Sequence, residues 1–82
     1  MKKEVLGILE KNITEGVYEA IEKNYEEWRD SSLFELGIDS LNYMALLVDL
    51  GESYNFTIED IESLNTLKSI EVILEKYGER NA

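Results

Sequence analysis

Apolar residues recur at intervals of three or four along most of this 82-residue chain, and no stretch alternates with the sustained two-residue period of a strand. The first such run predicts one amphipathic helix over roughly residues 3–23, with Gly16 tolerated inside it at a cost of about 1 kcal/mol relative to alanine. Its apolar stripe is formed by Val5, Leu9, Ile13, Val17 and Ile21, widened by Leu6 and Ala20.

The periodicity weakens over residues 24–37, which we predict to be a long ordered connection with a short helical turn near residues 32–35 and with aromatic side chains packed on the core. A second helix is expected from Asp39 or Ser40 to Ser53 or Tyr54, because Gly37 closes a turn and Asp39 is a good N-cap. The remaining chain predicts a short helix opened by a capping box of Thr57 and Asp60. It also predicts a last helix from residue 65 or 66 to about residue 77, with Gly78 as its stop.

The predicted fold is therefore all-α, a small four-helix bundle with three longer helices and one short third helix, in a single domain over residues 1–82. The chain has no cysteine, histidine or proline, so neither a disulfide nor a His/Cys zinc site can support this small core. The acidic residues also lack the spacing of a calcium loop, and we predict no metal site. Neither a signal peptide nor a membrane span is expected, which favours the cytoplasm.

The formal net charge of −10, from 18 acidic and 8 basic residues, argues against nucleic acid and anionic membranes as partners. Between Arg29 and Lys68 the chain contains no basic residue. The acidic residues in that interval are Asp30, Glu35, Asp39, Asp49, Glu52, Glu59, Asp60 and Glu62. This pattern fits either a solvated surface that keeps the protein soluble or a docking face for basic partners.

The predicted second helix carries two apolar stripes, more than one core contact requires. One stripe contains Tyr43, Leu46, Leu47, Leu50 and Tyr54 and has the spacing of a core face. The other contains Leu41, Met44 and Val48. Either this helix is central and buried on both sides, or the second stripe is an exposed docking patch beside Ser40.

Ser40 is the residue whose chemistry most needs an explanation. A Ser-His-Asp arrangement is impossible without histidine, and no lysine lies near Ser40 in the sequence, so we expect no enzyme. A hydroxyl at a helix N-terminus is well placed to carry a phosphate ester, because free N–H groups and the helix dipole stabilise an anion there. The alternative is that Ser40 only helps to start the helix.

The segment Gly37-Ile38-Asp39-Ser40-Leu41 resembles the Gly-x-Asp-Ser-Leu motif of acyl carrier and peptidyl carrier proteins. The similarity includes the lead-in SLFELG, the apolar helix after the serine and the later stretch YNFTIEDIESLNTLKSIEVIL. It covers nearly the whole chain and is weakest over the first thirty residues. It implies an acyl-carrier-like fold in which Ser40 receives 4'-phosphopantetheine from coenzyme A, through a magnesium-dependent phosphopantetheinyl transferase.

By the same resemblance, the arm would hold acyl, aminoacyl or peptidyl intermediates as thioesters, and Asp39 would aid transferase docking. Partner enzymes with basic surfaces would bind Leu41, Met44 and Val48, with Asp49 and Glu52 in an acidic rim. The family's fatty-acid carriers have more acids just after the serine than this chain, which has Asn42, Tyr43 and Ala45 there, and Gly51 interrupts a stretch that is commonly Glu-rich. We therefore favour a monomeric, free-standing carrier for a dedicated pathway of nonribosomal peptide, polyketide, aminoacyl or fatty-acid-like type over a carrier for the usual fatty-synthase partners. The alternative is an unmodified acidic helical adaptor that binds a basic partner.

Overall fold

The computed structural model describes residues 1–78, and the regular elements within them are helices. Backbone pairing of the β type is limited there to an isolated bridge between Ser32 and Thr66. The predicted all-α class is therefore confirmed. The helices are α1 (Lys2–Asn12), α2 (Glu15–Lys23), α3 (Tyr25–Trp28), α4 (Ser40–Ser53), α5 (Ile58–Ser63) and α6 (Leu67–Gly78).

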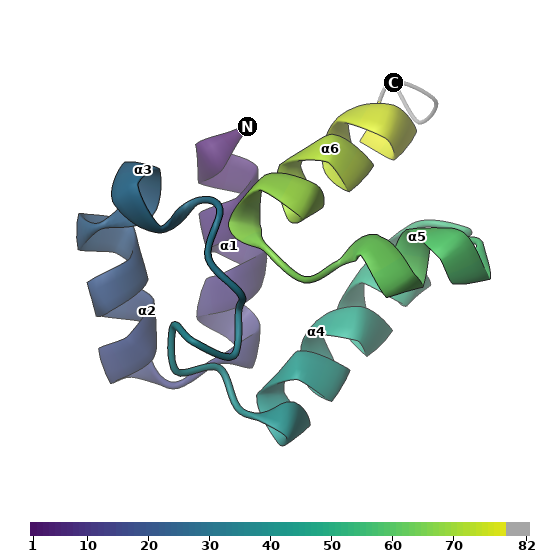
Figure 1. The fold of residues 1–82 in the computed structure, drawn as a ribbon. Coiled ribbons are helices and arrows are strands. Elements are labelled where there is room, and N and C mark those ends of the chain that lie inside the picture. The colour runs from purple at the N-terminus through teal and green to yellow at the C-terminus, as the bar shows by residue number, and fades with distance from the viewer. Residues whose placement is uncertain (79–82) are drawn as a thin grey trace.

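The prediction of one helix over residues 3–23 is wrong, because α1 and α2 form a hairpin (Figure 1). The chain is extended at Ile13 and Thr14 between the two helices. The physical reason lies in the four-residue spacing of the apolar stripe. Each four-residue step overshoots a full turn by about 40°, so a straight helix would rotate Val5 and Ile21 roughly 160° apart. The break at Thr14 lets both ends of the stripe reach the core.

The predicted starts of α4 and α5 are confirmed in atomic detail. The Asp39 carboxylate accepts a hydrogen bond from the backbone N–H of Asn42 at 2.8 Å, as an N-cap should. Thr57 and Asp60 form a reciprocal capping box, with both side chain to backbone distances at 3.1 Å. The start of α6 is fixed in a similar way, through reciprocal bonds between Thr66 and Ser69. The predicted stop at Gly78 adjoins residues outside the described range.

The connection between α2 and α4 differs from the prediction in two respects. It contains the short helix α3, which was not predicted, and the Phe34 ring is exposed although aromatic side chains were expected to pack on the core. Tyr25 and Trp28 do pack against the core as expected. The helical turn predicted near residues 32–35 is confirmed by the hydrogen bond from Glu35 N–H to the carbonyl of Ser32.

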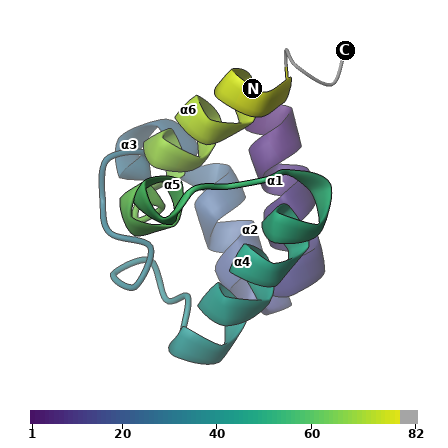
Figure 2. The same ribbon diagram turned by 90° about the vertical axis from the view of Figure 1, so that its right-hand side faces the viewer.

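α1 packs against α2, α4 and α6 and so connects the two sides of the bundle (Figures 1 and 2). α1, α2, α3, α4 and α6 contribute to one buried apolar cluster, and Leu64, directly after α5, joins it. Its members are Val5, Leu9, Ile21, Tyr25, Leu33, Ile38, Leu46, Leu50, Leu64, Leu67, Ile70, Ile73, Leu74 and Tyr77. Within residues 1–78, no helix is both long enough and apolar enough to cross a membrane.

Polar contacts tie the connection to α6. Glu71 accepts hydrogen bonds from the Tyr25 phenol at 2.6 Å and from the Arg29 guanidinium at 2.6 and 3.0 Å. The Arg29 carbonyl in turn accepts from the backbone N–H of Lys68 at 3.1 Å. The connection is therefore fixed in place before it enters α4.

Candidate functional site

Ser40 is the first residue of α4 and is exposed to solvent. The first turn of α4 protrudes at the bottom of the molecule in two perpendicular views (Figures 1 and 2). A hydroxyl at this position is open to a second protein on several sides.

The backbone that leads to Ser40 is held by buried anchors on both sides of a tight turn. Leu33 and Ile38 are fully buried, and the N–H of Ile38 donates to the carbonyl of Leu33 at 3.3 Å. Leu33 itself donates to the carbonyl of Asn65 at 2.9 Å, which links the turn to the α5–α6 junction. Gly37 has φ of 103°, and a Cβ at this position would lie 3.3 Å from Cγ2 of Val17 in α2. The turn therefore requires glycine at residue 37 and delivers Ser40 at a defined position.

The start of α4 suits an attached anion. α4 spans 14 residues, so the positive end of its dipole lies at Ser40. Asp39 satisfies the N–H of Asn42, while its own carbonyl accepts from the N–H of Tyr43. A phosphodiester on the Ser40 hydroxyl would extend outward from this positive end, into solvent.

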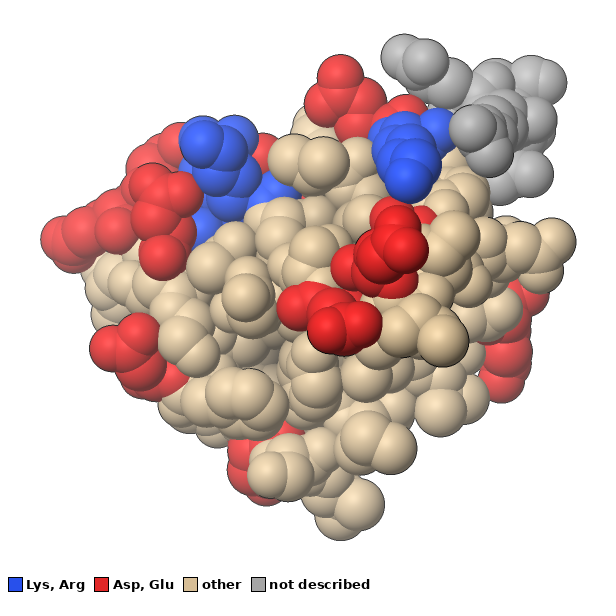
Figure 3. All heavy atoms as spheres, turned by 45° about the vertical axis from the view of Figure 1, so that its right-hand side comes forward, with Lys and Arg blue, Asp and Glu red and all other residues tan. Residues whose placement is uncertain are grey.

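The second apolar stripe of α4 is exposed, so the alternative in which α4 is buried on both sides is wrong. The exposed fractions are 79% for Leu41, 57% for Met44 and 58% for Val48. On the opposite side of α4, Leu46 and Leu50 are buried in the core. We call the three exposed side chains Leu41, Met44 and Val48 the α4 patch. Figure 3 shows the side of the molecule that comes forward from the right of Figure 1, where uncharged side chains cover most of the surface.

The acidic residues near α4 differ in what they contact. Glu52 is exposed, whereas the Asp49 carboxylate points to α1, where it accepts from the Asn12 amide at 2.8 Å and lies 3.7 Å from the Lys11 ammonium. Asp60 is buried and accepts from the Lys76 ammonium at 3.1 Å and from the Tyr77 phenol. These contacts hold the pKa of Asp60 well below its usual range, with the Tyr77 hydrogen bond as the main cause. Asp49 and Asp60 thus connect helices, while Asp39 and Glu52 face solvent.

Sequence reasoning missed three exposed apolar side chains in this region. Phe34 lies in the turn before Ser40, and Ile58 and Ile61 lie on α5. The i, i+3 spacing of Ile58 and Ile61 places them on one helix face, but the buried Leu64 follows Ile61 at the same spacing, so the spacing does not mark the pair as exposed. No periodic pattern marks Phe34 either, because it lies in an irregular turn.

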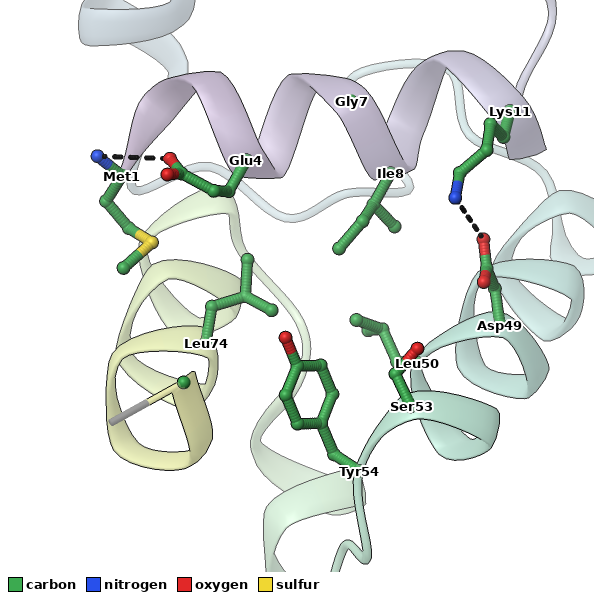
Figure 4. A pocket seen from close by; sticks show the side chains of 11 residues that line it. Met1, Glu4, Gly7, Ile8, Lys11, Asp49, Leu50, Ser53, Tyr54 and Leu74 are labelled. Atoms are coloured by element: carbon green, nitrogen blue, oxygen red, sulfur yellow. Dashed lines mark ion pairs between the residues drawn. The ribbon is translucent and has the colours of Figure 1, made fainter. Parts of the chain in front are cut away.

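A groove of about 500 Å³ lies between α1, α4 and α6, at the end of α4 opposite Ser40. Ile8, Leu50, Leu74 and the Tyr54 ring point into it (Figure 4). The Lys11–Asp49 ion pair lies at its edge. Ser53 lines the groove and lies thirteen helical steps after Ser40, about 20 Å along α4. The groove is therefore a separate feature from the Ser40 site.

In the described part of the chain, no cluster of three or more acidic side chains is arranged to hold a metal ion. Among known protein families, the model described as a phosphopantetheine attachment site matches residues 26–74 of this chain. The matched segment covers more than half of the chain and includes Ser40, all of α4 and all of α5. No curated protein and no solved structure matches the chain significantly.

Proposed function

Because the chain belongs to the phosphopantetheine attachment-site family, whose prosthetic group is covalently bound 4'-phosphopantetheine, we propose that Ser40 is the residue that carries this group. The family gives the chain a carrier role. The observation that supports Ser40 most directly is its exposed hydroxyl at the protruding first turn of α4.

In this proposal the chain positions the Ser40 hydroxyl, and the catalytic groups belong to the transferase. A phosphopantetheinyl transferase provides the base and the magnesium ion. The Ser40 oxygen attacks the phosphorus that carries pantetheine in coenzyme A, its proton passes to the base, the bridging P–O bond of the pyrophosphate breaks, and adenosine 3',5'-bisphosphate leaves. The anchors Leu33 and Ile38 and the turn at Gly37 hold Ser40 in place for this attack. The new phosphodiester lies at the positive end of the α4 dipole, which stabilises its charge. Once attached, the arm supplies a thiol that holds acyl, aminoacyl or peptidyl groups as thioesters.

The α4 patch is the surface that we propose for partner enzymes. Apolar side chains next to acidic groups favour partners that combine an apolar contact with basic side chains. Met44 adds an adaptable thioether, which suits contact with several different enzymes in turn. Asp39 and Glu52 are the exposed acids that would attract such partners, while Asp49 would contribute from its position against α1.

A dedicated biosynthetic pathway remains our proposal for the cargo, with nonribosomal peptide, polyketide or aminoacyl transfer as its class. The reason is the composition of α4 after Ser40, where Asn42, Tyr43 and Ala45 replace the acids of fatty-acid carriers. We propose a monomer that acts in the cytoplasm. The family match does not favour the alternative of an unmodified acidic adaptor.

The test is mass spectrometry of the purified protein after incubation with coenzyme A, magnesium and a broad-specificity phosphopantetheinyl transferase. We expect a mass gain of one phosphopantetheine group, absent in the Ser40→Ala variant. The matched control is Ser53→Ala, an exposed serine at the other end of the same helix, which should be modified like the native protein. No gain in the native protein, or a gain that persists in Ser40→Ala, would reject Ser40 as the attachment residue.

A further inference from the structure

Phe34 is an exposed aromatic residue in a turn whose other apolar side chains face inward. Its side chain is 52% exposed, whereas Leu33 and Ile38 are fully buried and Leu36 packs partly against the core. Folding of the turn therefore does not require an aromatic ring at residue 34. An exposed large apolar side chain that the core does not use is a candidate for contact with another group.

The Phe34 ring is nevertheless held in a defined position. It packs against the Tyr43 ring with 5.1 Å between centroids and an angle of 54° between planes. Tyr43 is itself fixed, because its phenol donates to the carbonyl of Leu64 at 2.7 Å. The backbone carbonyl of Phe34 accepts from the N–H of Gly37 at 3.2 Å. One side of the ring thus rests on α4 and the rest faces solvent.

The geometry of α4 places this ring next to Ser40. Ser40 and Tyr43 are three residues apart on the helix, which brings their Cβ atoms to about 5–6 Å. The Phe34 ring packs against that same tyrosine. A chain that leaves the Ser40 hydroxyl therefore begins beside an aromatic surface formed by Phe34 and Tyr43.

We propose that the Phe34 ring binds the pantetheine arm attached to Ser40, by packing against its geminal dimethyl group and first amide. This inference rests on the function proposed above. The arm offers methyl groups and a planar amide within its first few atoms, and both pack well on an aromatic face. Because the arm is tethered, its effective concentration at the ring is in the range of roughly millimolar, so a weak contact is enough to bias its direction. Phe34 is a positioning residue in this scheme and takes no part in a reaction.

The experiment uses the modified protein and proton NMR of its pantetheine geminal methyl groups. We expect these methyl signals to lie upfield of their position in coenzyme A, and to show nuclear Overhauser contacts to the Phe34 ring protons. In Phe34→Leu, which keeps the apolar volume, the upfield shift should be lost. The control is Val72→Leu on α6, because Val72 is exposed to a similar extent, 54%, and α6 does not contribute to this site.

Three outcomes would overturn the proposal, and they separate it from the function on which it rests. If the protein gains no mass on incubation with the transferase, both proposals fail. If the protein is modified but its methyl signals stay at their coenzyme A positions, the arm contact alone fails. If those signals are unshifted while Phe34→Leu lowers the transferase kcat/KM, the ring serves the transferase and not the arm.

Discussion

The phenol of Tyr77 donates a hydrogen bond to the buried carboxylate of Asp60 and so joins the C-terminal helix α6 to the short helix α5. The same carboxylate accepts from the backbone N–H of Thr57 and from the Lys76 ammonium, each at 3.1 Å. The Tyr77 ring also packs edge-on against Phe56, with 5.4 Å between centroids. A six-residue helix has little stability of its own, so these contacts give α5 much of its attachment to the bundle.

The first prediction concerns the dependence of stability on acid. The pKa of Asp60 is lowered chiefly by the Tyr77 hydrogen bond, and the pKa of Glu71 is lowered chiefly by Arg29. A carboxyl whose pKa is lower in the folded protein stabilises it above the unfolded pKa, and this contribution is lost as the pH falls through the folded pKa. We therefore expect the free energy of unfolding to decrease below about pH 4, the ordinary range for these groups.

The Asp60→Asn variant isolates the part due to Asp60. Asparagine cannot carry the charge that the Lys76 ammonium faces, so the variant should unfold at a lower urea concentration than the native protein at pH 6. The gap between the two proteins should narrow below about pH 4, because the unfolded native chain gains a proton at Asp60 there, while the pKa of the folded carboxyl is held lower. Urea titrations followed by circular dichroism at pH 6, 4 and 2.5 provide the measurement. A constant gap across this range would contradict the role given to Asp60.

The local parts of the fold could be predicted from the sequence, and the parts that depend on distant contacts could not. The cap at Asp39 and the capping box at Thr57 each involve residues three apart, so a short sequence motif is enough to predict them. The break between α1 and α2 depends instead on which surfaces meet in three dimensions. The apolar spacing of Val5 to Ile21 continues through the break without a gap. Its drift of about 40° per step disfavours one straight helix, but the place of the break depends on the packing of the hairpin.

The candidate site shows the same division. The motif singles out Ser40, and helical periodicity places Leu41, Met44 and Val48 on one face of α4, but the exposure of that face came only from the structure. The contacts of Asp49 with α1 and of Asp60 with α6 could not be predicted, because their partners are 37 and 17 residues away in the sequence. The number of acidic residues in this region is therefore larger than the number of carboxylates that are free to meet a partner at its surface.

The second prediction contrasts two glycines. Gly37 has φ of 103°, and an added Cβ would meet Val17 at 3.3 Å, so Gly37→Ala should destabilise the protein by about 1–2 kcal/mol. Gly51 lies inside α4 with open space around it, so Gly51→Ala should stabilise the protein by about 0.5–1 kcal/mol. Thermal and urea denaturation of the two variants measure both effects. Equal effects of the same sign would refute the conformational argument for Gly37.

The third prediction tests the α4 patch as a docking surface. Met44 is largely exposed, so Met44→Glu should change stability by no more than about 0.5 kcal/mol. If the transferase covers the α4 patch, the new carboxylate would become buried in that interface. It should then lower the transferase kcat/KM by about tenfold or more, which corresponds to about 1.4 kcal/mol of lost transition-state stabilisation. Val72→Glu is the matched control, since it adds the same charge at a similarly exposed residue on α6. Equal kcat/KM values for the two variants would show that the α4 patch is not a transferase contact.

The last prediction separates the two roles of Asp39. Its carboxylate caps α4, and it is also an exposed acid next to Ser40. Asp39→Asn keeps a hydrogen-bond acceptor for the N–H of Asn42, so it should lose only the interaction of the charge with the helix dipole, about 0.3–1 kcal/mol. Asp39→Ala removes the cap as well and should lose about 0.5–2 kcal/mol.

If the charge of Asp39 serves the transferase, both variants should be modified more slowly than the native protein, by about tenfold, whatever their difference in stability. The measurement combines urea denaturation with the rate of mass gain at Ser40 under the same conditions. A native rate in Asp39→Asn together with a slow rate in Asp39→Ala would assign the effect to the helix cap. In that case Asp39 would act by shaping the start of α4 and not by attracting the transferase.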